Sequence, residues 1–424
     1  MVIEMIDKNY QNLFIFDHAS YLPNGSSPQR HYALARELLM MGIKTTLIGS
    51  GFDHRSGRNI KFDGLSLWKS QVVDGVRYVW LRLPVYKGFK ARVLNMIFYP
   101  VLAILCFLSG YLGRPKCVVG SSPHLFAALG ANAVAFLAGT RFVLEIRDLW
   151  PDSAVDVLGL NSKNPFVFAM RVVEKHLFCS ADRVISVLPG IARYVNDKKF
   201  SVKHHPVWIP NGVDLENFPA TISYANRVEG KIIYFGAVGP ANKLDMLLRI
   251  WAEIEKISSH LSLQIIGDGP SLPGIVSQCR ELGLKRVEFL GFCKEKAELY
   301  SLASKASAFV LAVPVRRIYE YGVSMNKIPE YLSLGRPLIY LGYGLDKNLD
   351  SKPYALAIND ADDKKVACRI IEFVAHAAGQ EEMMKDARLL AEQMYSYTSL
   401  AKHFYQACMD VSQSGTDEVI CSKS

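Results

Sequence analysis

The feature that most constrains the fold is an alternation of short apolar segments, turn-rich loops and helical stretches, which runs through the chain twice. At its start, Asn12–Phe16 is typical of a buried strand, and the loop 21–29 is rich in Pro, Gly, Asn and Ser. The helical stretch Arg30–Met41 then leads through Gly42 to a second apolar strand at Lys44–Gly49. Strands joined by helices run parallel, so this pattern predicts a parallel sheet with helices on both faces.

The rest of the chain extends the pattern into two domains. Further strands are expected at Val76–Leu83, Lys116–Gly120, Arg141–Ile146 and Arg183–Val187 in the first run, and at Lys231–Phe235, Leu261–Ile266, Val287–Leu290, Ala308–Leu311 and Pro337–Leu341 in the second. We therefore predict two Rossmann-like, doubly wound α/β domains at residues 1–218 and 231–394, a linker at 219–230, a C-terminal helix at 395–411 and a polar tail at 412–424.

The composition favours a folded intracellular protein. The eight cysteines include no C-x-x-C pair and the ten histidines no H-x-x-H pair, so no disulfide framework or metal site is expected. The first eleven residues carry three charges and no long apolar run, so we expect no secretory signal and a cytoplasmic location. The net charge of +9 is concentrated: between Leu81 and Lys116 there are six basic residues and no acidic one.

Within that basic region, Val93–Gly113 runs for 21 residues without a charge, which matches the length of a membrane-spanning helix. Spanning is disfavoured, because the strands before and after the segment should belong to one sheet. A buried crossover helix and a helix lying partly in one leaflet both remain open. We favour the second, with the peripheral protein on the inner face of the cell membrane, because a buried helix does not explain the flanking basic groups. These membrane candidates are Lys87, Lys90, Arg92, Arg114 and Lys116.

The stretch Tyr321–Tyr340 predicts a loop, a short helix capped by Ser324 or Asn326, and a strand. Lys327 in the first turn suits a bound phosphate, and Glu330 is spaced to accept hydrogen bonds from a ribose diol. An ordinary capped surface helix is the alternative. Gly236, Gly239 and Lys243, which follow the strand Lys231–Phe235, form a plausible phosphate loop.

Five motifs in order resemble those of the retaining glycosyltransferases of family 4, which have the GT-B fold of two Rossmann-like domains facing across a cleft. They are Arg183–Leu188, I-P-N-G-V-D-x-x-x-F at Ile209–Phe218, Ile265–Pro270, Val287–Phe292 and Asn326–Pro337. The segment Val143–Asp152 looks most similar to members that build bacterial O-antigen, capsule and exopolysaccharide. The resemblance covers about residues 12 to 411 and implies catalytic roles for Arg147, Asp148, Asn326 and Lys327. It implies donor binding by Gly25, Gly236, Gly239, Lys243, Gly267, Asp268, Ser324 and Glu330.

One departure concerns the family's pair of Glu residues eight apart: Gly322 replaces the first, and Glu320 is out of register. The resemblance implies a hexosyl- or N-acetylhexosaminyltransferase that moves a sugar from a nucleotide-diphosphate sugar, UDP in preference to GDP, to a polyprenyl-diphosphate-linked saccharide. No cofactor, metal or nucleic acid is expected. A sugar-nucleotide 2-epimerase and an inactive membrane-associated nucleotide-sugar or glycan-binding protein remain alternatives. A dehydrogenase is disfavoured, because no G-x-G-x-x-G is complete.

Overall fold

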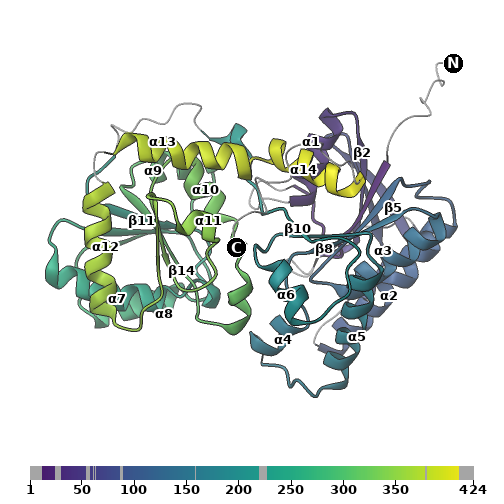
Figure 1. Ribbon diagram of the computed structural model, residues 1–424, viewed down its shortest axis with the longest axis horizontal. Coiled ribbons are helices and arrows are strands. Elements are labelled where there is room, and N and C mark those ends of the chain that lie inside the picture. The colour runs from purple at the N-terminus through teal and green to yellow at the C-terminus, as the bar shows by residue number, and fades with distance from the viewer. Residues whose placement is uncertain are drawn as a thin grey trace. The chain divides into compact units, whose positions relative to one another are not determined.

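The computed structural model describes residues 12–23, 30–53, 58–60, 62, 64–85, 89–157, 159–218, 227–377 and 380–409. The chain forms two compact units (Figure 1). Unit 1 contains Met1–Pro210 and Thr398–Ser424, and unit 2 contains Asn211–Tyr397. Each unit is built on its own mainly parallel sheet, which confirms the predicted α/β fold class with two doubly wound domains.

The sheet of unit 1 has eight strands in the order β10-β9-β8-β7-β1-β2-β6-β5, all paired in parallel except β5 with β6. The strands are β1 (Asn12–Phe16), β2 (Lys44–Ser50), β5 (Trp68–Val73), β6 (Val76–Leu81), β7 (Cys117–Ser121), β8 (Arg141–Ile146), β9 (Arg183–Ser186) and β10 (Val207–Trp208); β3 (Phe52–Asp53) and β4 (Arg58–Asn59) pair separately. Strand β5 lies outside the predicted strands. The turn Asp74-Gly75, with positive φ at both residues, joins it to β6.

Helices cover both faces of this sheet. They are α1 (Arg30–Met40), α2 (Phe89–Leu108), α3 (Leu125–Ala138), α4 (Asp152–Asp156), α5 (Pro165–Ser180), α6 (Ile191–Asp197) and α14 (Tyr397–Met409). Figure 1 shows α1 and α14 on one side of the sheet and α2, α3 and α5 on the other. Helices α2 and α3 pack closely, since a Cβ atom on Gly130 would lie 2.8 Å from Cα of Pro100.

The apolar segment Val93–Gly113 forms most of α2 and the turn after it. One side of the helix is buried: Tyr99 and Ala103 have no exposed surface, and the Tyr99 hydroxyl donates to the carbonyl of Ile48 at 2.6 Å. The opposite side is exposed. None of the helices in the described ranges is long and apolar enough to cross a membrane. The segment is therefore the crossover helix between β6 and β7, with one apolar side left uncovered within unit 1.

The sheet of unit 2 has six strands in the order β13-β12-β11-β14-β15-β16, all parallel. The strands are β11 (Lys231–Phe235), β12 (Ser262–Ile266), β13 (Val287–Gly291), β14 (Ala308–Ala312), β15 (Leu338–Leu341) and β16 (Ala355–Ile358). The α-helices are α7 (Leu244–Ile257), α8 (Leu272–Glu281), α9 (Lys296–Ala303), α10 (Lys327–Ser333), α11 (Lys347–Asp350), α12 (Asp363–Ala377) and α13 (Glu381–Leu390). Helices α7 and α8 cover one face of the sheet, and α9 and α10 cover the other (Figure 1).

The two units divide eight residues before the predicted boundary at residue 218. The difference arises because 211–218 packs within unit 2: the Phe218 ring stacks on Tyr300 with centroids 4.0 Å apart, and Val213 pairs with Ser396. The C-terminal helix also differs from expectation, since all but the first residue of α14 belongs to unit 1, where Phe404 is fully buried. Residues 219–226 of the predicted linker and the tail 412–424 lie outside the described residues.

Candidate active site

Each sheet has a point at which the chain leaves two neighbouring strands in opposite directions. In unit 1 the chain leaves β1 toward β2 and leaves β7 toward β8; in unit 2 it leaves β11 toward β12 and β14 toward β15. Ligands of open α/β sheets bind beyond the carboxyl ends of the strands at such a switch point. Polar side chains that follow these strands are therefore candidate site residues in each unit.

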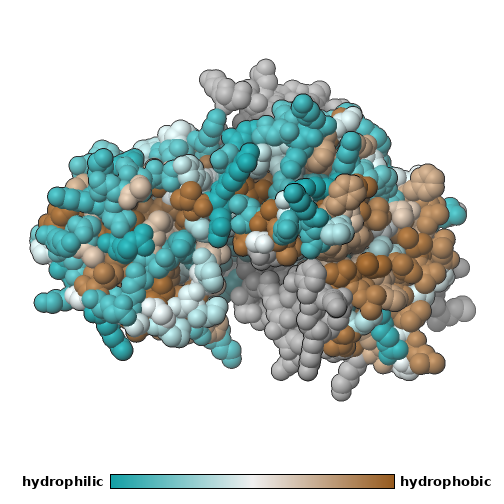
Figure 2. All heavy atoms as spheres, turned by 90° about the horizontal axis from the view of Figure 1, so that it is seen from below, coloured by the Kyte–Doolittle hydropathy of each residue, from teal (hydrophilic) through white to brown (hydrophobic). Residues whose placement is uncertain are grey.

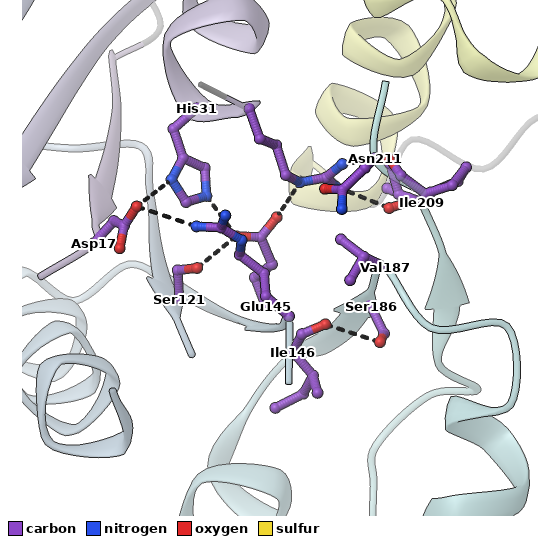
Figure 3. Close-up of polar contacts among 12 residues, drawn as sticks. Asp17, His31, Ser121, Glu145, Ile146, Ser186, Val187, Ile209 and Asn211 are labelled. Carbon is purple, nitrogen blue, oxygen red and sulfur yellow. Dashed lines mark hydrogen bonds and ion pairs between the residues drawn. The ribbon is translucent and has the colours of Figure 1, made fainter. Parts of the chain in front are cut away.

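A buried network of charged side chains occupies this edge of unit 1 (Figure 3). His31 on α1 bridges two carboxylates, with Nδ1 2.8 Å from Oδ2 of Asp17 and Nε2 2.5 Å from Oε2 of Glu145. The Arg30 Nε donates to the other Glu145 oxygen at 2.8 Å, and Ser121 Oγ donates to Glu145 at 2.7 Å. All five side chains are buried. The network joins α1 to the ends of β1, β7 and β8.

Burial and pairing act against each other on these groups. Burial disfavours the imidazolium of His31, but the charges of Glu145 and Asp17 outweigh it, and the pKa of His31 is raised. Burial likewise disfavours both carboxylates, yet His31 lowers the pKa of Asp17, and His31 and Arg30 lower the pKa of Glu145 well below its usual range. Both ring nitrogens of His31 face carboxylate oxygens, which favours the imidazolium, so the positive charges of His31 and Arg30 oppose the negative charges of Asp17 and Glu145.

Arg147 adds one further positive charge to this balanced network. Its Nη1 lies 3.3 Å from Oδ2 of Asp17, and its side chain is 30% exposed, whereas that of Asp17 is 6% exposed. The backbone N–H of Arg147 donates to Ser122 Oγ at 2.8 Å. A guanidinium held by a buried carboxylate at a strand end can bind an anion such as a phosphate.

Asp148, the neighbouring predicted residue, makes local contacts. Its carboxylate accepts hydrogen bonds from the backbone N–H of Leu149 at 2.9 Å and from Nε1 of Trp150 at 3.1 Å, and from the hydroxyl of Ser153. Burial raises its pKa, although these hydrogen bonds oppose the shift. The hydrogen bonds of the Asp148 carboxylate are therefore made within the turn between β8 and α4.

In unit 2 the corresponding edge holds Lys327. Its Nζ donates to the hydroxyl of Tyr234 at 2.9 Å and to Oδ1 of Asn242, and it lies 4.9 Å from the centre of the Tyr234 ring. Helix α10 is attached to β11 by Tyr331, whose hydroxyl donates to the carbonyl of Phe235 and accepts from its N–H, both at 2.9 Å. The lysine is therefore held at the end of a central strand.

Three glycines allow the loops around Lys327 to approach closely. A Cβ atom on Gly236 would lie 2.1 Å from Cε of Lys327, and Gly236 has φ +134°. Cβ atoms on Gly267 and Gly269 would lie 1.9 Å from the Gly236 carbonyl oxygen and 2.3 Å from that of Val238. Substitution of any of the three would push these loops or the lysine stem aside.

Lys327 and Glu330 both have shifted pKa values. Burial lowers the pKa of Lys327 to about 8, with Glu330 opposing the shift. Burial raises the pKa of Glu330, while Lys296 and a 3.4 Å hydrogen bond from the Tyr300 hydroxyl oppose it. A partly buried cation with a pKa lowered by burial is stabilised when an anionic ligand binds beside it.

Other predicted residues lie as follows. Helix α10 begins at Lys327 with Asn326 as its N-cap residue, which confirms the later of the two predicted starts; the Asn326 side chain makes no capping hydrogen bond. Ser324 contacts Asn211 instead, which donates from Nδ2 to the Ser324 carbonyl at 3.0 Å. Lys243 pairs with Asp245 at 3.2 Å.

The remaining residues fall into two groups. The Asp268 side chain accepts from the N–H of Gly269 at 2.7 Å, and Gly239 precedes the short 3-10 helix at Pro240–Asn242. Gly25 and Lys87 lie outside the described residues, as do the side chains of Lys90 and Arg92, whereas Arg114 and Lys116 are exposed.

Sequence reasoning missed Asp17, His31 and Glu145 in unit 1 and Tyr234 and Asn242 in unit 2. A signal was present for two of them. Asp17 directly follows an apolar strand, and Glu145 is the acidic residue of the otherwise apolar strand core Phe142–Ile146. No pattern along the chain connects His31 with these carboxylates, because their pairing depends on the packing of α1.

Comparisons with known proteins agree with the division of the chain into two units after Pro210. Residues 28–212 match the family described as "Glycosyl transferase 4-like domain", and residues 229–376 match the family described as "Glycosyl transferases group 1". A curated relative, the putative colanic acid biosynthesis glycosyl transferase WcaI of Escherichia coli (strain K12), is 21% identical over 243 residues. That match covers 54% of this chain and 59% of the relative.

Two solved structures share the fold over almost the whole chain. Sucrose-phosphate synthase from Thermosynechococcus elongatus is 16% identical with a TM-score of 0.69, and covers 95% of this chain and 98% of its own. The Anabaena protein Alr3699/HepE in complex with UDP is 12% identical with a TM-score of 0.63, and covers 95% and 100%. These similarities show the GT-B fold.

Proposed function

We propose, on the premise that this chain is a two-domain glycosyltransferase of the GT-B fold, that it transfers a sugar from a UDP-sugar to a lipid-linked saccharide in bacterial surface-polysaccharide synthesis. The observation that carries the proposal is Lys327, a partly buried cation held at the end of the central strand of unit 2. The relative named for colanic acid biosynthesis supports the polysaccharide assignment, and the neighbour that binds UDP supports the nucleotide.

In this proposal unit 2 binds the donor. Lys327 contacts the diphosphate, with Asn326, Gly236 and the loop of Gly267 and Asp268 around it, and Glu330 accepts hydrogen bonds from the ribose hydroxyls. The acceptor hydroxyl attacks the anomeric carbon from the face that the diphosphate leaves, so configuration is retained. The new glycosidic bond forms as the carbon–oxygen bond to phosphate breaks, and the acceptor proton passes to the departing phosphate oxygen. The cation of Lys327 offsets the charge that develops on the leaving group.

Unit 1 binds the acceptor in this proposal. Arg147, held by Asp17, would contact an anionic group of the acceptor or the donor, such as a phosphate. A polyprenyl-diphosphate acceptor requires the enzyme to work at the cytoplasmic membrane face, in keeping with the basic, acid-free region of unit 1.

The test is a panel of UDP-, GDP- and dTDP-sugars with polyprenyl-diphosphate saccharides, in which mass spectrometry follows the lipid product. We expect a product with UDP-sugars. Epimerised sugar nucleotide formed without acceptor, or binding without any turnover, would contradict the proposal in favour of an epimerase or a binding protein.

Glu330→Gln should raise the donor KM by about 10- to 100-fold, because hydrogen bonds to a charged group contribute about 1.5–3 kcal/mol. Steady-state kinetics with varied UDP-sugar measures this. Glu253→Gln, on α7, is the matched control, since Glu253 forms an ion pair with Lys256 on the same helix. An unchanged donor KM in Glu330→Gln would remove Glu330 from the site.

A further inference from the structure

Three neighbouring helices of unit 1 leave an apolar face uncovered. In order across the sheet they are α2, α3 and α5, with α2 packed beside α3 and α3 beside α5. Along α2 an exposed stripe recurs at spacings of three or four residues, which places it on one side of the helix: Leu94, Phe98, Val101, Leu105 and Leu108. The stripe points away from the buried side that contains Tyr99.

The neighbouring helices extend this face. Phe136 on α3 is 84% exposed and Phe168 on α5 is 66% exposed. Helix α3 contains no ionisable side chain. Figure 2 shows hydrophobic residues gathered over this part of unit 1, whereas the surface of unit 2 in the same view is mostly hydrophilic. We call the exposed apolar side chains of α2, α3 and α5 the apolar face. Large exposed aromatic and aliphatic groups gathered in one area mark an interaction surface.

The charge around the apolar face identifies the partner. From Gly75 to Leu144 the sequence has eight basic residues and no Asp or Glu. Two of these, Arg114 and Lys116, are exposed just beyond the end of α2. Outside this range, Lys163 is exposed just before α5. A second copy docked on the same face through a two-fold axis would bring two basic rims together. An anionic lipid surface instead receives both the apolar groups and the cations.

We infer that the apolar face of α2, α3 and α5 inserts into one leaflet of an anionic bilayer, with Arg114, Lys116 and Lys163 against the headgroups. This assignment rests on the membrane location in the proposed function and names the surface of unit 1 that contacts the membrane. The contacting surface extends beyond α2, because Phe136 and Phe168 project from two further helices. No helix in the described ranges has to cross the bilayer for this to occur.

Flotation of the full-length protein with lipid vesicles tests the inference. We expect binding to phosphatidylcholine vesicles that contain phosphatidylglycerol, weaker binding without the anionic lipid, and loss of that difference at high salt. The double variant Phe136→Ser/Phe168→Ser should bind at least tenfold more weakly. The double variant Arg114→Gln/Lys116→Gln should lose the preference for anionic vesicles. Phe292→Ser, which removes an exposed aromatic residue of unit 2, is the matched control and should bind normally.

Three results would overturn the inference. They are wild-type protein that binds neither vesicle, serine variants that bind as wild type, and a dimer seen by light scattering that the serine variants convert to a monomer. UDP binding and thermal unfolding confirm that each variant is folded. Vesicle binding needs no sugar donor, so Glu330→Gln should float like wild type. Flotation therefore tests the membrane surface separately from the transferase assignment, which the panel of sugar nucleotides tests.

Discussion

At the scale of single residues, Lys327 makes the site of unit 2 sensitive to pH. In the proposed function the charged lysine binds the diphosphate, and burial places its pKa at about 8. As the pH rises through that value the free protein loses the cation, so UDP affinity should fall up to tenfold per pH unit above 8. Titration calorimetry with UDP from pH 7 to 9.5, a range in which the terminal phosphate stays ionised, measures this.

Lys327→Arg is the matched control, because a guanidinium stays protonated throughout this range. Its UDP affinity should be almost independent of pH. A decline as steep as that of wild type would show that another group controls the pH dependence.

At the scale of elements, glycine contacts decide how α2 and α3 pack. Gly130→Ala should destabilise the protein by about 1–3 kcal/mol, because the added Cβ would lie 2.8 Å from the backbone of Pro100. Gly274, on α8, has nothing within 4 Å of an added Cβ, so Gly274→Ala should be neutral or stabilising by up to about 1 kcal/mol. Chemical denaturation measures both. Equal effects would mean that the contact of α2 with α3 is not close in solution.

The alternation of apolar strands and helices predicted most of the parallel strands of both units to within a few residues, because buried parallel strands are continuously apolar. The parallel edge strand β16 was not among the predicted strands. The alternation also did not predict β5, an exposed edge strand whose only clear signal is Asp74-Gly75. It placed Lys327 and Glu330 at the start of a short helix, which α10 confirms; their role in donor binding stays a prediction. The Asp17, His31 and Glu145 contacts depend on long-range packing, which no local pattern encodes.

At the scale of the whole molecule, the residues that the proposed function assigns to the donor, among them Lys327 and Glu330, belong to unit 2. A ligand present at 100 times its Kd stabilises the state that binds it by about 2.7 kcal/mol. Saturating UDP should therefore slow amide hydrogen exchange within residues 227–377 more than in unit 1, as measured by mass spectrometry. Protection confined to unit 1 would contradict the assignment of the donor site.

The membership of α14 in unit 1 has a consequence for synthesis. The chain passes from unit 1 to unit 2 after Pro210 and returns after Tyr397. Helix α14 supplies the buried residues Leu400, Phe404 and Cys408. Domains usually fold in the order in which the ribosome makes them. Here synthesis of unit 1 begins first, but its core is complete only after the whole of unit 2 has been translated. Truncation after Tyr397 would therefore remove part of the core of unit 1, the unit whose synthesis began first.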